Sequence, residues 1–124
     1  MKIGAVGLGN RIAHVYHELS QINKDAELIA YVDPLPIGRE YAEKNNFFPT
    51  KEYSTLNEML SNEKLDLLMI GSPNHLHLEH IKEGLEAGLK IFAEKPIVVD
   101  ENQTIELAKL IKKFGQNKIL VGLG

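Results

Sequence analysis

The sequence contains no cysteine. This absence excludes a disulfide framework, a thiolate nucleophile and a zinc site with cysteine ligands, and it is compatible with a reducing compartment. The chain also lacks an apolar run approaching the roughly 18 residues that a membrane-spanning helix needs. The N-terminus enters a strand-like apolar run directly, without the successive regions of a secretory signal. We therefore expect a cytoplasmic protein with no membrane partner.

The chain carries no large excess of charge of either sign. Lysine and arginine together number 14 and aspartate and glutamate 17, for a formal net charge of −3. A mildly acidic balance argues against a nucleic-acid surface of the usual basic kind. With 124 residues, 44% of them hydrophobic, and no repeat, low-complexity tract or linker, residues 1–124 are predicted to form one domain.

Short apolar runs alternate with segments of helical periodicity along the whole chain. This alternation is typical of βαβ units and predicts an α/β fold, a doubly wound parallel sheet between two layers of helices, with strand order 3-2-1-4-5-6. The predicted strands, each expected to be buried on both faces, are 3–7, 28–32, 65–71, 89–93 and 118–122, with a weaker one near 47–49.

Three groups of apolar residues recur at helical spacing between these runs and are expected to cover the sheet. They are Ile12, Val15, Tyr16, Leu19 and Ile22; Leu78, Ile81 and Leu85; and Leu107, Ala108, Ile111 and Phe114. Asp100, followed three residues later by Gln103, resembles a capping box that begins the last helix. Gly88 and Gly115 lie where helices are expected to end.

A glycine turn follows the first strand and opens the first helix. In this context a G-x-G pattern indicates dinucleotide binding. Gly7 would allow the tight turn, and Gly9 would let backbone N–H groups of the helix start approach a pyrophosphate. Ile12 stands where a third small residue is usual, so the helix would lie farther from the strand or be rotated. The candidate cofactor residues are Gly7, Gly9, Asn10, Arg11 and Ile12; a plain strand-to-helix turn is the alternative.

Asp33 ends the second strand, 24 residues beyond Gly9. An acid at this position accepts hydrogen bonds from an adenosine ribose, and its charge repels a 2′-phosphate. The combination favours NAD as the cofactor and disfavours NADP, although Arg39 downstream is a basic residue that would suit a phosphate. The alternative is an aspartate that only starts the turn before Pro34.

Three further segments extend the pattern: Ser72-Pro73-Asn74-His75-Leu76-His77, residues 87–90 (A-G-L-K) and Glu94-Lys95-Pro96. Together with the glycine turn and Asp33, in this order and spacing, they resemble the Gfo/Idh/MocA family, named after glucose-fructose oxidoreductase, inositol dehydrogenase and rhizopine catabolism. The resemblance covers essentially all 124 residues. It implies the NAD(P)-binding Rossmann domain of a two-domain oxidoreductase acting on sugars, polyols or related compounds.

The resemblance implies that Lys95 is the catalytic lysine. At the mouth of the fifth strand an ammonium can stabilise a developing alkoxide or transfer a proton; a solvated strand-end lysine is the alternative. Glu94 would point toward the cofactor ribose, unless it only pairs with a neighbouring cation. Pro96 would fix the chain after Lys95, and the family often has a cis peptide bond there.

By the same resemblance Ser72, Pro73 and Asn74 form a turn beside the dinucleotide. Asn74 is also a good helix N-cap, and capping alone could explain it. His77 would lie in the first helical turn near the nicotinamide side of the cleft, or be purely structural. His75, His77 and His80 suggest zinc, but the chain has no H-E-x-x-H pattern and no cysteine, so no metal site is predicted.

The family's second domain carries the substrate contacts and often the oligomer interface, and no counterpart is present in these 124 residues. We expect the chain to be the first domain of a longer enzyme, inactive alone, with a small-molecule substrate in the full-length protein; a homo-oligomer is left open. The main alternative is a non-catalytic module that senses NAD or an adenine nucleotide and acts through a partner. A third is an assembly module that binds no nucleotide.

Overall fold

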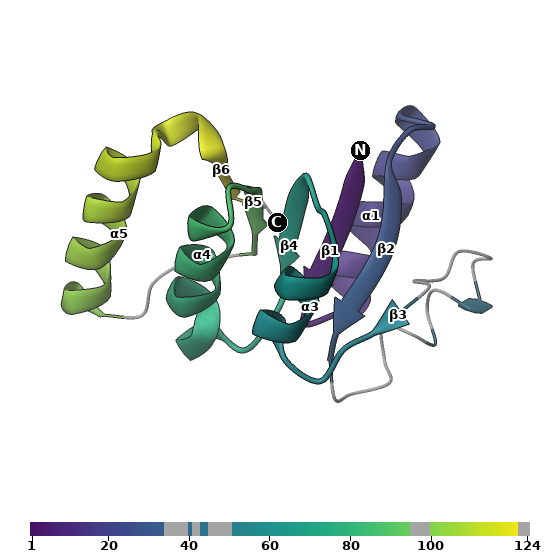
Figure 1. The fold of residues 1–124 in the computed structure, drawn as a ribbon, viewed down its shortest axis with the longest axis horizontal. Helices are drawn as coiled ribbons and strands as arrows, with labels where there is room; N and C mark the ends of the chain where they lie inside the picture. Colours follow the sequence, from purple (N-terminus) through teal and green to yellow (C-terminus); the bar gives the residue numbers. More distant parts are fainter. Residues whose placement is uncertain (34–39, 41–42, 45–50, 95–99, 122–124) are drawn as a thin grey trace.

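The computed structural model describes residues 1–33, 40, 43–44, 51–94 and 100–121. They form a six-stranded sheet in the order β3-β2-β1-β4-β5-β6, as predicted (Figure 1). All five strand pairs are parallel. The strands are β1 (Lys2–Val6), β2 (Glu27–Val32), β3 (Lys51–Glu52), β4 (Leu67–Ile70), β5 (Lys90–Ala93) and β6 (Ile119–Val121). The weaker strand predicted near 47–49 lies outside the described residues.

Helices cover both faces of this sheet. In Figure 1, α1 lies behind the strands, α3 and α4 lie in front, and α5 stands beside α4 at the β6 end. The helices are α1 (Asn10–Ile22), α3 (Leu56–Asn62), α4 (His77–Glu86) and α5 (Glu101–Phe114), with 3-10 turns η1 (Asn74–Leu76) and η2 (Gln116–Lys118). This is the doubly wound α/β fold that the sequence predicts. Within the described ranges no helix is long and apolar enough to cross a membrane.

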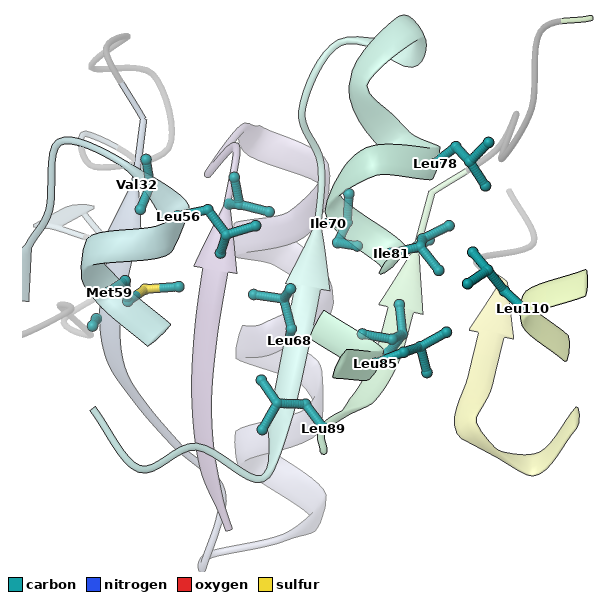
Figure 2. Close-up of a cluster of buried hydrophobic side chains, with 14 residues drawn as sticks. Val32, Leu56, Met59, Leu68, Ile70, Leu78, Ile81, Leu85, Leu89 and Leu110 are labelled. Carbon is teal, nitrogen blue, oxygen red and sulfur yellow. The ribbon is translucent and has the colours of Figure 1, made fainter. Parts of the chain in front are cut away.

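Two apolar cores result from the alternation of side chains along each strand. Leu68 and Ile70 of β4 pack against α3 and α4 in the core that Figure 2 shows, whereas Met69 between them belongs to the core under α1. The sheet is therefore buried on both faces at its centre, as expected for strands of this composition.

Three details differ from the predicted pattern. Ile22, the last residue of α1, is 84% exposed. Leu120 is 64% exposed, so the edge strand β6 is not buried on both faces. In α5 the buried residue is Leu110, whereas Ala108 is exposed. Leu107, Leu110 and Phe114 follow the i, i+3, i+7 face that points at the core, and Ala108 falls off that face.

The helix ends agree with the local sequence signals. Gln103 N donates to Asp100 Oδ1 over 2.8 Å, so Asp100 caps α5 as predicted. Gly88 and Gly115 follow the ends of α4 and α5 with φ of +84° and +100°. Side chains rarely adopt this backbone conformation, which explains why glycine stands at both positions.

Candidate functional site

The carboxyl ends of β1, β2 and β4 meet at the glycine turn. Gly7 N donates to Val32 O and Gly71 N donates to Val6 O, each over 2.8 Å. Gly7 has φ of +77°, and a β-carbon there would lie 2.3 Å from the backbone nitrogen of Ser72. Only glycine fits this position, so Gly7 makes the tight turn that the pattern predicts.

Gly9 occupies the N-cap position of α1 and faces open space. A β-carbon at Gly9 would meet no atom within 4 Å. The first turn of α1 contains no acidic residue, so no carboxylate offsets the positive end of the helix dipole. An open N-terminus of this kind suits a phosphate group. Arg11 lies in the same turn and is exposed. The Asn10 side chain lies outside the described part of the structure.

Ile12, at the position where a third small residue is usual, is buried. It is 1% exposed, and a β-carbon at Gly71 would lie 2.4 Å from Ile12 Cγ1. The missing side chain at Gly71 therefore makes room for Ile12 beside β4. Because the Ile12 side chain belongs to the core, a cofactor contact at this residue would be made by its backbone.

Asp33 directly follows β2 and is half-buried. It lines a cavity of about 460 Å³ together with Gly7, Leu56, Pro73 and His80. It also borders a second hollow of about 530 Å³ that is lined by Glu52, Tyr53 and Ser54. The structure thus brings the acid after β2 and the glycine turn after β1 to one cavity, hereafter the Asp33 cavity.

The turn after β4 is held by two histidine rings. His77 Nε2–H donates to the backbone carbonyl of Ser72 over 2.5 Å, and Ser72 Oγ lies 2.7 Å from His80 Nδ1. Ser72 is 7% exposed. The interpretation of Asn74 as a helix N-cap is wrong, because η1 intervenes and Leu76 takes the N-cap position of α4. Ser72 and Pro73 line the Asp33 cavity.

His77 is 1% exposed and its Nε2 is committed to the Ser72 carbonyl. The ring therefore anchors the turn; its place near the nicotinamide stays a prediction. His80 is directed at the same serine through its own Nδ1. Among the residues described, no three histidine or acidic side chains are grouped as metal ligands would be.

Glu94 follows β5, where its backbone N–H donates to Ile70 O over 3.1 Å. Its Oε1 is buried and has no hydrogen-bond partner within the described ranges. Burial raises the pKa of the Glu94 carboxyl, while the charges of Arg11 and His77 oppose that rise. The site therefore contains a carboxylate oxygen that lacks a donor, near the start of α1. Lys95 and Pro96, like Arg39, lie outside the described residues.

Sequence reasoning did not anticipate α3 or the cavity wall that it forms. Leu56 of α3 and Leu76 before α4 line the Asp33 cavity with His80 and Glu83. A signal for α3 was present: Thr55 is followed three residues later by Glu58, the spacing of a capping box. In the structure Glu58 N donates to Thr55 Oγ1 over 3.1 Å.

A second cavity lies at the other end of the sheet. It has a volume of about 560 Å³ and is lined mainly by apolar side chains of α1, β4, β5 and β6, among them Leu19, Met69, Phe92 and Leu120. Neither the glycine turn nor Asp33 borders it. The candidate cofactor residues Gly7, Asp33, Ser72 and Pro73 line the Asp33 cavity instead.

A family model described as "Oxidoreductase family, NAD-binding Rossmann fold", GFO_IDH_MocA, matches residues 1–122. The chain belongs to this family. The resemblance drawn from the glycine turn, Asp33 and the segments after β4 and β5 is thereby confirmed, as is the Rossmann fold. Family membership also agrees with the prediction of NAD as the cofactor.

Two dehydrogenases resemble the chain along nearly all of its length. Inositol 2-dehydrogenase/D-chiro-inositol 3-dehydrogenase of Lactiplantibacillus plantarum is 24% identical over 121 residues, 98% of this chain and 35% of the relative. D-glucoside 3-dehydrogenase of Escherichia coli is 28% identical over 117 residues, 94% of this chain and 33% of the relative.

Among solved structures, scyllo-inositol dehydrogenase from Lactobacillus casei, with bound NAD(H) and scyllo-inositol, superposes with a TM-score of 0.82 at 27% identity. The match covers 98% of this chain and 36% of that one. The chain thus spans about a third of the length of its relatives.

Two observations test whether the residues present fit NAD. The open space at Gly9 leaves room for a pyrophosphate against the start of α1. The orphaned Oε1 of Glu94 lacks a donor that a ribose hydroxyl can supply. Both features fit the cofactor.

Proposed function

We propose that this chain is the cofactor-binding domain of a dehydrogenase that transfers hydride between a nicotinamide and a sugar, polyol or related hydroxyl or carbonyl compound. The observation that carries the proposal is the convergence of Gly7 and Asp33 on one cavity, beside the open N-terminus of α1. Membership of the oxidoreductase family supports it. The inositol and glucoside dehydrogenases among its relatives support the substrate class.

Each part of the site has a proposed binding role. The N–H groups that begin α1 bind the pyrophosphate, and Asp33 accepts hydrogen bonds from the adenosine ribose. The turn of Ser72, Pro73 and Asn74 flanks the cofactor. Glu94 accepts a hydrogen bond from the second ribose, which satisfies its orphaned oxygen. The negative charge of Asp33 disfavours a 2′-phosphate, so the site prefers NAD to NADP.

NAD, when bound, supplies the nicotinamide ring that accepts or releases a hydride. Lys95, the residue after Glu94, is the proposed catalytic group. Its ammonium stabilises negative charge on the substrate oxygen and transfers a proton there. The contacts that hold the substrate come from residues outside this chain, in the part of the relatives that it does not span. The domain alone therefore binds cofactor without turning over substrate.

The experiment that tests the proposal is calorimetric titration of the 124-residue chain with NAD, NADP and ADP. We expect NAD and ADP to bind, and NADP to bind more weakly than NAD. A chain that binds none of the three would overturn the proposal and favour an assembly role. Equal affinity for NAD and NADP would remove the assigned preference of Asp33 while leaving the dinucleotide site in place.

A further inference from the structure

His80 is part of the wall of the Asp33 cavity. It lies on α4, is half-buried, and faces the same space as Leu56, Pro73 and Leu76. A mainly apolar cavity that begins at a ribose-binding carboxylate suits the flat base attached to that ribose. His80 thus stands where it would meet a purine edge if the proposed function holds.

The bond to Ser72 determines which proton His80 offers. Ser72 is buried, and His80 Nδ1 is the one hydrogen-bond partner of its hydroxyl within the described ranges. A buried hydroxyl needs an acceptor for its proton, and Nδ1 supplies it. Burial also lowers the pKa of His80, more than the charge of Glu79 raises it, which favours the neutral ring. A neutral imidazole that accepts at Nδ1 carries its proton on Nε2.

Nε2 has no partner in the part of the chain that the structure describes. Glu83 lines the same wall, yet no ion pair or hydrogen bond joins it to His80. The bond to Ser72 therefore orients the His80 ring, and the N–H group at Nε2 is left to donate to a ligand.

We propose that His80, oriented by Ser72, donates a hydrogen bond from Nε2 to a ring nitrogen of the adenine base and so helps the cavity recognise that base. This inference rests on the proposed dinucleotide function and adds a specificity residue to it. Adenine has three such acceptors, N1, N3 and N7, and its 6-amino group cannot take their place because it is a donor. His80 is a binding residue here and takes no part in hydride transfer.

The test compares ADP with its 1-deaza, 3-deaza and 7-deaza analogues by calorimetry on the intact chain and on His80→Phe. Phenylalanine keeps the flat ring and removes the N–H donor. We expect the chain to bind one analogue more weakly than ADP by about two- to twelvefold, the range of one neutral hydrogen bond. His80→Phe should bind ADP more weakly by a similar factor and lose the difference between ADP and that analogue.

Two further variants separate recognition from a structural role. His80→Gln retains an N–H donor and should keep part of the discrimination, even if His80→Phe does not fold. His75→Phe alters an exposed histidine of η1 that does not line the cavity, and should bind all four ligands as the parent does.

Three results would overturn the inference. The first is that the intact chain binds ADP and its three analogues equally. The second is that His80→Phe still binds one analogue more weakly than ADP. The third is that His80→Phe and Ser72→Ala weaken the binding of all four nucleotides by one common factor. The last result would reduce His80 to a support for the Ser72 turn. Failure of the chain to bind both ADP and NAD is a different outcome, because it overturns the proposed function and this inference with it.

Discussion

Ile12 lies so close to Gly71 that a β-carbon on the glycine would come within 2.4 Å of Ile12 Cγ1. The two residues belong to different βα units, the first helix and the end of β4. Their contact explains how this Rossmann domain accommodates a bulky residue where the glycine fingerprint has a small one. In this chain the small residue that makes room for close packing is Gly71, directly after β4, and the residue at position 12 is large.

Gly71→Ala should destabilise the domain, because its methyl group overlaps Ile12 and also lies 2.6 Å from Gly7 O. We expect a loss of about 1–3 kcal/mol in the free energy of unfolding, as for overpacked cores. Ile12→Ala alone should cost about 2–5 kcal/mol. Because the smaller side chain makes room for the methyl group, the double variant should lose less than the sum. Urea denaturation of the four proteins gives this coupling; strict additivity would contradict it.

Asp33→Ala should weaken NAD binding by about tenfold to a hundredfold, since it removes a hydrogen bond to a charged acceptor, which contributes roughly 1.5–3 kcal/mol. The affinity for NADP should fall much less, because removal of the charge also removes repulsion of the 2′-phosphate. Calorimetry with both cofactors measures the two changes. Asp25→Ala is the matched control, because Asp25 is an exposed acid that precedes β2, at the opposite end of that strand from Asp33. Parallel losses for NAD and NADP would argue that Asp33 does not contact the ribose.

Gly9→Val should abolish dinucleotide binding and leave stability nearly unchanged. The new side chain fills the open space at the start of α1, and the φ of −84° at Gly9 is accessible to any residue. Chemical denaturation checks the fold, and titration with NAD checks binding. Undiminished affinity in a folded variant would show that the pyrophosphate lies elsewhere.

Glu94→Gln should stabilise the domain near neutral pH while weakening NAD binding. Burial raises the pKa of Glu94 above its ordinary value of 4.5, so between the unfolded and the folded pKa the folded state holds a proton that the unfolded state has released. The folded state therefore loses stability as pH rises from about that value, and the glutamine variant avoids this loss. Denaturation of both proteins at pH 4 and pH 7 should show a larger advantage of the variant at pH 7. An advantage that does not change with pH would refute this account.

The 124-residue chain should show no dehydrogenase turnover with NAD and an inositol or a glucoside, even at saturating cofactor. Positioning of the substrate accounts for roughly 7–11 kcal/mol of a barrier, and the proposed substrate contacts lie outside this chain. In a longer protein that contains it, Lys95→Ala should slow single-turnover hydride transfer and spare NAD affinity. Robust turnover by the chain alone would place the active site entirely within it.

Local signals determined much of this structure. The apolar runs that became strands, the cap at Asp100 and the helix ends before Gly88 and Gly115 each depend on neighbouring residues and were predictable one segment at a time. The strand order followed from the handedness of βαβ crossovers, which is a property of the backbone itself. Gly7 and Asp33 were predictable site residues because their positions at strand ends follow from the same pattern.

Tertiary structure alone decided how those segments meet. The burial of Leu110 rather than Ala108, and the exposure of Leu120, depend on which face each element turns to its neighbours. The accommodation of Ile12 at Gly71 joins residues almost sixty positions apart. The orphaned oxygen of Glu94 likewise depends on groups from other elements. Sequence periodicity specifies which side of a helix or strand is apolar, but packing determines which side chains from distant segments share a cavity, because that depends on shape and distance in the folded chain.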